Sequence, residues 1–442
     1  MKIGFVPIDN RPVCYTLPEQ IAAIDKNIEL YMPERGWLGD LTKYADTEKI
    51  LDWLDNLPEL DAVIVSLDTV AYGGLISSRR SNDTFEQIKA RIEKLKQILC
   101  KKKAQIYAFS SIMRISNNNI NEEEKEYWSK WGRKIFNYSY CMNKYGTMCK
   151  KEVPDEILED YLKTRKRNFE INKVYLEWQK QGLFNTLVFS KDDCAEYGLN
   201  VQEAKALEAL GGFIKTGADE IPLTLLARAI QGEVKITPVF LEPQYKDLVS
   251  NYEDISIEKS VLGQIELAGC KVSEYSEADI LLYVNNFKEK QGEIVMEIYT
   301  EPFNGKWIEP NTPYMIADVR FANGADNNFT GQIFKSGLHE NFYGYAAWNT
   351  SANSLGSLIC AAKIKFLAQI YDDAAFKKFQ TVRFLDDWAY QANVRQTKPD
   401  VITIKDRMSV FEKEVFEKLD ISANLSYKFP WNRLFDVEVE FN

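Results

Sequence analysis

Short apolar segments alternate with longer amphipathic segments along most of this chain. This alternation is typical of βα units, in which each strand is followed by a helix and successive strands run parallel. Parallel strands that are buried on both faces read as continuously apolar, as the runs AVIVSL and ADILLYV do. Strands are therefore predicted at residues 3–8, 62–67, 105–110, 186–190, 235–241, 280–284, 314–317 and 342–347.

Eight parallel strands joined mainly by helices predict an α/β fold of the TIM type, a (β/α)₈ barrel. The alternative is two doubly wound α/β lobes with a cleft between them. A ninth apolar run at 211–216 is interpreted as a loop that leads into a helix at about 219–229. The barrel is expected to span residues 1–398.

Two segments are expected to be additions to the barrel. Residues from about 121 to 181 are rich in charged and aromatic side chains and predict a helical insertion between the third and fourth strands. Its first residues, NEEEKE, are interpreted as the solvated start of a helix. Residues 399–442 are expected to form a small C-terminal α/β extension.

Composition narrows the classes of function. The 442 residues carry a formal net charge of −10, which gives no general reason to bind nucleic acid or an anionic membrane. The single histidine, His339, excludes sites that need two or three imidazoles from one chain. Seven cysteines without CxxC spacing predict reduced thiols, and the charged start of the chain predicts a cytoplasmic protein. We expect a small-molecule or oligosaccharide substrate and no cofactor.

Polar side chains follow nearly every predicted strand at its C-terminal end. In parallel α/β folds this edge holds the ligand, because the βα loops and the helix N-termini meet there. Each residue alone is more readily explained as a helix cap than as a catalytic residue. Their shared position predicts a substrate-binding pocket that contains Asp9, Asn10, Arg11, Asp68, Tyr72, Arg79, Asn285, Asn286, Asp318, Trp348 and Asn349.

The adjacent pair Asp192 and Asp193 is the sharpest catalytic candidate. Neighbouring residues on a regular strand face opposite sides, so both carboxyl groups can border one pocket only if the second lies in the turn. Like charges held this close raise one pKa and leave one carboxylate and one proton donor. This division suits the hydrolysis of a glycosidic bond. A divalent-metal site and a helix cap are the alternatives.

Several segments resemble a bacterial family known only as domain of unknown function 4127. They are PIDNRP, DTVAYGGLISSR, SKDDCAEYGL, GADE, ADVRFANGAD, AAWNTSANSLG and DDWAYQANVR. The similarity covers most of the chain, and the family's name implies no activity.

The order of motifs is more distantly similar to that of the O-GlcNAcase and hyaluronidase-type β-N-acetylglucosaminidases, which are (β/α)₈ barrels. That resemblance implies that Asp192 orients the substrate acetamide and that Asp193 is the general acid and then the base. It also implies that Asn285 or Asn286 holds sugar hydroxyls and that Asn349 follows the eighth strand. The Asn-Tyr-Pro-Val-Asn-Asp motif of those enzymes is absent here.

Three functions are therefore open. The first is a glycoside hydrolase that acts on an N-acetylhexosaminide and needs neither metal nor histidine. The second is a metal-dependent hydrolase with oxygen ligands from Asp9, Asp68, Asp192, Asp193, Asp219 and Asp318. The third is a non-catalytic sugar-binding protein, in which Trp348, Arg11, Arg79 and Arg114 hold an anionic ligand.

Overall fold

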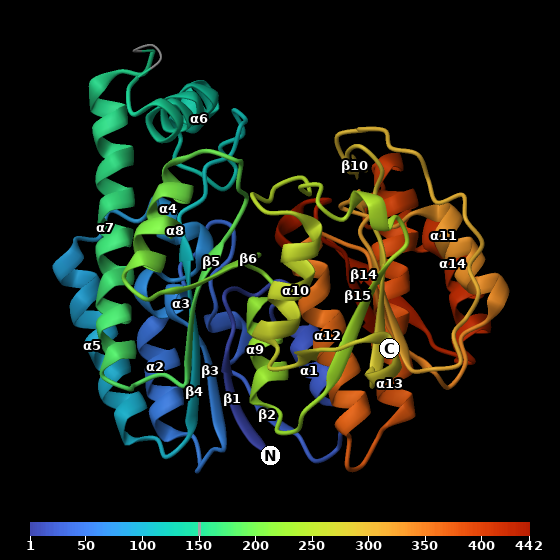
Figure 1. Ribbon diagram of the computed structural model, residues 1–442. Helices are drawn as coiled ribbons and strands as arrows, with labels where there is room; N and C mark the ends of the chain where they lie inside the picture. The colour runs from blue at the N-terminus through green and yellow to red at the C-terminus, as the bar shows by residue number, and fades with distance from the viewer. Residues whose placement is uncertain (149–151) are drawn as a thin grey trace. The chain divides into compact units, whose positions relative to one another are not determined.

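The computed structural model describes residues 1–148 and 152–442, and the contacts within it divide the chain into two compact units. The first unit comprises Met1–Asn10, Glu29–Pro222 and Tyr252–Asp254. The second comprises Arg11–Ile28, Leu223–Asn251 and Ile255–Asn442. Each unit is built around its own parallel sheet (Figure 1).

The first unit contains a six-stranded sheet in the order β2-β1-β3-β4-β5-β6, and all of its pairs are parallel. Its strands are β1 (Lys2–Val6), β2 (Glu29–Tyr31), β3 (Ala62–Ser66), β4 (Gln105–Ile112), β5 (Thr186–Lys191) and β6 (Phe213–Thr216). Every residue of β3 and β5 is buried, in agreement with their continuously apolar sequences. The central strands are therefore covered on both faces.

The helices of the first unit follow the strands as the sequence pattern predicts. They are η1 (Arg35–Trp37), α2 (Thr47–Asn56), α3 (Leu67–Tyr72), α4 (Leu75–Arg80), α5 (Phe85–Lys101), α6 (Trp128–Tyr145), α7 (Asp155–Lys180) and α8 (Leu199–Ala209). Helix α5 begins with a reciprocal capping box between Thr84 and Gln87. It buries Ile88, Ile92 and Leu95 along one face. Figure 1 shows α7 beside α5 and β4, which it contacts.

The second unit contains a five-stranded sheet in the order β13-β11-β9-β7-β8. Its strands are β7 (Lys235–Phe240), β8 (Lys271–Val272), β9 (Ile280–Asn285), β11 (Tyr314–Asp318) and β13 (Phe342–Ala346), and all are parallel. Two small pairs accompany it, β10 (Gly292–Glu293) with β12 (Phe321–Ala322) and antiparallel β14 (Leu425–Lys428) with β15 (Glu438–Phe441).

The helices of this unit are α1 (Thr16–Ala22), α9 (Ile221–Ala229, which belongs to it from Leu223 onward), α10 (Ile257–Leu267), α11 (Asn327–Ser336), α12 (Ser351–Leu367), α13 (Asp373–Arg383) and α14 (Ile404–Leu419). Shorter helical turns are η2 (Pro243–Tyr245), η3 (Tyr275–Glu277), η5 (Arg395–Thr397) and η6 (Pro430–Asn432). The segment η4 (Phe384–Val394) is a π-helix.

All eight predicted strands are confirmed, and so is the α/β class with parallel sheets. The single (β/α)₈ barrel is not confirmed, because the eight strands are shared equally between two sheets that do not close in the described residues. They fit the alternative of two doubly wound α/β sheets. Both sheets have the same order, since renumbering β7, β8, β9, β11 and β13 as 1 to 5 gives 2-1-3-4-5, as in β2-β1-β3-β4-β5.

The loop predicted at 211–216 is wrong, because Phe213–Thr216 forms strand β6 and pairs with β5. As an edge strand it is only partly buried and carries Lys215, so it lacks the continuous apolar character of the central strands. This strand occupies the side of β5 on which a continuing barrel would place β7.

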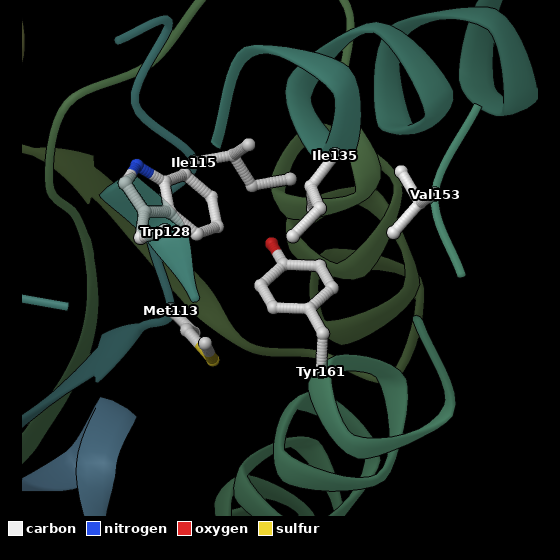
Figure 2. Packing of buried hydrophobic residues seen from close by; sticks show 6 residues of the cluster. All are labelled: Met113, Ile115, Trp128, Ile135, Val153 and Tyr161. Carbon is white, nitrogen blue, oxygen red and sulfur yellow. The ribbon is translucent and has the colours of Figure 1, made fainter. Parts of the chain in front are cut away.

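Helices α6 and α7 lie between β4 and β5 in the chain, where the insertion is predicted, and its bounds stay a prediction. Figure 2 shows how it packs. Side chains from α6, from α7, from the residues just before α7 and from the segment after β4 meet in one buried apolar cluster, whose labelled members are Met113, Ile115, Trp128, Ile135, Val153 and Tyr161. The rings of Trp128 and Tyr161 lie 5.8 Å apart. The insertion is therefore anchored on the residues that follow β4.

Two further predictions concern the thiols and the C-terminal extension. Cys141 is disulfide-bonded, which contradicts the prediction that all cysteines are reduced. Cys149 lies outside the described residues. The expected C-terminal helix and strand are present as α14 and β15, and the boundary at residue 398 stays a prediction. Within the described chain, none of the helices has the length and apolar character needed to cross a bilayer.

Candidate functional site

The segment after β4 carries Arg114 between two residues of the apolar cluster. Its neighbours Met113 and Ile115 are both buried in that cluster. The Arg114 guanidinium group instead contacts the carboxylates of Glu123 and Glu124. The packing of the insertion therefore fixes the position of this guanidinium group at the C-terminal end of the first sheet.

Arg114 brings the predicted catalytic pair together. Its Nη1 atom lies 3.1 Å from Asp193 Oδ2 and 3.6 Å from Asp192 Oδ2. The two carboxyl groups therefore border the same guanidinium nitrogen, as the adjacent-aspartate prediction requires. The backbone amide of Asp193 also donates to Asp192 Oδ1 over 3.1 Å, which places Asp193 in the turn beyond β5.

A second arginine, Arg79, approaches the same carboxylates from α4. Helix α3 ends at Gly73 with φ 87°, and Gly74 follows with φ 132°. These left-handed values let the chain turn at once into α4, which carries Arg79. Its Nη2 atom lies 3.6 Å from Asp192 Oδ2, and both atoms are buried without a hydrogen bond. The pair is therefore held by charge attraction alone.

Two glutamates complete what we call the first-unit cluster, namely Arg79, Arg114, Glu123, Glu124, Asp192 and Asp193. Glu124 Oε1 accepts hydrogen bonds from Arg79 over 2.9 Å and from Arg114 over 3.0 Å. Glu123 Oε2 lies 2.9 Å from Arg114 Nη2. The prediction that NEEEKE is simply a solvated helix start is thus wrong for Glu124, which is buried and doubly paired.

The electrostatics of this cluster favour protonated aspartates. Four carboxyl groups face two guanidinium groups, so full ionisation would leave an excess of two negative charges. Burial is the largest cause that raises the pKa of Asp193, to about 7, and the Asp192 charge is the next. Burial also raises the pKa of Asp192, although Arg114 and Arg79 oppose that rise. Asp193 can therefore carry a proton near neutral pH.

Asp68 lies at the start of α3, at the same end of the sheet. Its Oδ2 accepts the backbone N–H of Ser111 over 2.8 Å, and its Oδ1 lies 3.2 Å from the Ser110 hydroxyl. Burial raises its pKa to about 6, while these hydrogen bonds lower it. The Ser110 hydroxyl also lies 2.7 Å from Asn172 of α7. Asp68 thus ties α3 to β4, and Ser110 ties β4 to the insertion.

The remaining predicted residues of the first unit are buried or bound through their backbone. The Tyr72 hydroxyl is buried without a hydrogen bond, and burial raises its pKa. Asp9 is buried at the end of β1. Asn10 donates its backbone N–H to Gly39 and accepts a hydrogen bond from Arg35 on its carbonyl.

The asparagine pair predicted after the sixth strand has a different character. Asn286 uses both ends of its side-chain amide on the backbone of Glu242, at 2.9 Å each. Asn285 donates to Asp318 over 2.7 Å and accepts from Arg320 over 3.0 Å. Both asparagines are fully buried. The amide of Asn286 therefore ties β9 to the end of β7 and is not available to hold a sugar hydroxyl.

Arg320 is the centre of what we call the second-unit network, namely Glu242, Asn285, Asp318, Arg320 and Asp326. Beside its bond to Asn285, Arg320 donates to the Glu301 carbonyl over 3.0 Å and to Glu242 Oε1 over 3.1 Å. Asp318 Oδ2 accepts from the backbone N–H of Asp326 over 2.8 Å and lies 3.2 Å from the Tyr345 hydroxyl. Burial, followed by the Asp326 charge, raises the pKa of Asp318 to about 8.

The other predicted residues of the second unit are also buried. Trp348 is 1% exposed and its ring lies 5.6 Å from that of Phe435, so in this structure it offers no face to a sugar. Asn349 has φ 72° and accepts on Oδ1 from the backbone of Thr350. Arg11 stacks on Trp431 at 5.1 Å. These three contacts are those of packed structural residues.

Comparison with known families adds one finding. The model of a family described as protein of unknown function, DUF4127, matches residues 3–403. The chain belongs to this family. No curated protein and no solved structure matches the chain. Family membership thus confirms the resemblance to domain 4127, and the similarity to β-N-acetylglucosaminidases stays a prediction.

The structure also bears on a metal site in this DUF4127 member. Among residues 1–148 and 152–442, no group of three or more His, Cys, Asp or Glu side chains is arranged to hold a metal ion. Asp192 and Asp193 face Arg114 instead. Arg114 thus offsets part of the negative charge of these two members of the predicted ligand set.

Sequence reasoning missed Glu123, Glu124 and Glu242 as members of these groups. Glu123 and Glu124 lie in the segment interpreted as a solvated helix start, and Glu242 lies beyond a predicted strand, so their partners could not be identified from the local pattern. A signal was present for Arg114 and Arg320, because each arginine follows a buried strand by two residues. A cation at that position predicts a carboxylate partner from a neighbouring loop.

Proposed function

We propose that this protein is a glycoside hydrolase that acts on N-acetylhexosaminides, with Asp192 and Asp193 as its catalytic carboxyl groups. The observation that carries the proposal is their shared contact with Arg114 Nη1, which brings two adjacent carboxyls to one point at the C-terminal end of the sheet. Two neighbouring carboxyl groups of different protonation are what glycosidic hydrolysis requires.

The two aspartates are suited to different tasks. The Asp193 side chain is 30% exposed and its pKa is raised to about 7, so it can protonate the leaving oxygen and later accept a proton from water. The Asp192 side chain is 15% exposed and its Oδ2 has no hydrogen bond. We assign it to the substrate acetamide, whose N–H would satisfy that oxygen and whose carbonyl would attack the anomeric carbon.

The charge of the cluster supports this function over an anion-binding one. Arg79 and Arg114 are each within 3.6 Å of at least three carboxylates, so neither carries a spare positive charge toward an acidic ligand. A neutral N-acetylated sugar meets no charge penalty there, whereas a uronic acid or phosphosugar would be repelled.

The test is the hydrolysis of two N-acetyl-β-hexosaminides, one with a 4-nitrophenyl leaving group and one with a methyl leaving group. Asp193→Asn should lower kcat by about 10²–10⁴-fold for the methyl glycoside and by much less for the aryl glycoside, which needs no protonation. Asp192→Asn should slow both substrates to a similar degree.

Asp55→Asn is the matched control, because Asp55 is an exposed aspartate of α2 that pairs with Lys101. It should leave both rates unchanged. Absence of turnover by the wild-type protein on every N-acetylhexosaminide, or equal turnover in both active-site variants and the wild type, would overturn the proposal.

A further inference from the structure

The first unit contains a cavity that none of the predicted site residues lines. Its volume is about 550 Å³, within the size range of small-molecule sites. The wall consists of residues 81–86, which lead from α4 into the start of α5, together with Lys125 and one face of α7. Helices α5 and α7 pack against each other, as Figure 1 shows, and the first two residues of α5 line the cavity.

One face of α7 supplies most of the charge in this cavity. Lys163, Lys166, Arg167 and Glu170 all line it, and their spacing of three and four residues places them on one side of the helix. The sequence KTRKRNFE thus directs three cations toward one space. The aliphatic parts of the lysine side chains and the Phe85 ring add apolar surface to the cavity.

Most of the acidic side chains that line the cavity are paired with a cation, which lies either in the cavity wall or outside the cavity. Asp83 pairs with Arg91 at 2.8 Å, and Glu170 pairs with Lys173 at 3.0 Å. Neither Arg91 nor Lys173 lines the cavity. Asp160 pairs with Lys125 at 2.7 Å. The three acids therefore do not balance the cations of α7.

The remaining charges leave an excess of two positive. Within the described chain, Lys163, Lys166 and Arg167 have no carboxylate partner at ion-pair distance, and Glu86 is the single acid of the lining without a cation. Arg167 donates all of its N–H groups to oxygens of the Ser78, Ser81, Asp83 and Asn168 residues. It is fixed in place, and the two acids that attract its charge, Asp83 and Asp160, are each paired with another cation.

The direction of α5 adds to this positive potential. Its 17 residues begin at Phe85, so the positive end of the helix dipole lies at the cavity wall. Helix N-termini stabilise bound anions, and phosphate is the commonest of them. This contribution supports the cation excess and does not stand alone.

We propose that this cavity binds a small organic phosphate monoester, with Lys163 and Lys166 donating to the phosphate and Arg167 supplying fixed charge. A dianion matches the excess of two positive charges, and the volume leaves room for an organic group beside the phosphate. The proposal goes beyond the glycosidase function and does not depend on it.

The test is isothermal titration calorimetry of the full chain with glucose 6-phosphate, with glucose and inorganic phosphate as comparison probes. We expect saturable binding of the sugar phosphate, weaker binding of inorganic phosphate and none of glucose. The Lys163→Gln/Lys166→Gln double variant should weaken binding at least about tenfold, because two charged donors are lost. Both lysines are exposed, so folding should be unaffected.

Two single variants separate a specific site from general charge effects. Lys180→Gln removes an exposed lysine from the last turn of the same helix, away from the cavity, and should leave the affinity unchanged. Glu86→Gln removes the unbalanced acid and should tighten binding by about two- to fivefold. Absence of saturable binding, or equal losses in the double variant and in Lys180→Gln, would overturn the proposal whatever the outcome of the hydrolase assays.

Discussion

The C-terminal ends of the two sheets carry similar residues but differ in how completely their hydrogen bonds are made. In the second-unit network, Arg320 uses Nε, Nη1 and Nη2, and Asn285 uses both ends of its amide. In the first-unit cluster, Arg79 Nη2 and Asp192 Oδ2 are buried within 3.6 Å of each other without a hydrogen bond. One network is saturated and the other is not.

This difference separates a structural role from a chemical one. A buried polar network whose members are all paired stabilises one arrangement and leaves no atom for a ligand. A buried polar atom without a partner costs free energy, and a site retains it where a ligand supplies the missing bond. Sites after equivalent strands of two sheets with the same order therefore need not share a function.

The largest expected effect comes from a substitution that breaks the second-unit network. Arg320→Met would remove the cation that faces Asp326 and the donor to Asn285, both in a buried place, and would leave Glu242 with Lys288 alone. Removing one partner of a buried ion pair costs about 3–5 kcal/mol of unfolding free energy. Urea unfolding followed by circular dichroism measures it. A loss below about 1 kcal/mol would show that the network is not structural.

Asn286→Ala is expected to have an intermediate effect. The change leaves a backbone N–H and a backbone C=O of Glu242 without their partners, at a cost of about 2–3 kcal/mol. Asn56→Ala is the control, since Asn56 is exposed at the end of α2 and its loss should change stability by less than about 0.5 kcal/mol. Equal unfolding midpoints for the two variants would contradict the structural role of Asn286.

The smallest expected effect is a change in how stability depends on pH when Asp193 of the first-unit cluster is replaced. Because the pKa of Asp193 is raised from 3.8 to about 7 in the folded state, its folded form favours the proton. Its contribution to stability is thus fully present below pH 3.8 and is lost as the pH rises through about 7. The stability of Asp193→Asn relative to wild type should therefore increase between these limits and stay level above them. A difference that is flat across this range would mean that the aspartate pair does not interact as described.

Sequence alone located the elements better than their assembly. All eight strands were found because continuous burial on two faces leaves a local apolar pattern, and the insertion was found from its length and composition. Such local patterns do not show whether the strands close into a barrel. Closure depends on which strand pairs with β5, and in this structure that strand is the weakly apolar β6.

The same limit applies to the site. The adjacency of Asp192 and Asp193 is a property of the chain, so the sequence alone determined that two carboxyls lie together after β5. Tertiary structure decided that Arg79, Arg114 and Glu124 surround them, because those residues are brought in by α4 and by the packed insertion. It also decided that the Asn286 side chain is hydrogen-bonded to the backbone of Glu242, 44 residues away. Local patterns record burial and spacing along the chain, whereas charge balance and hydrogen-bond saturation depend on which distant segments meet.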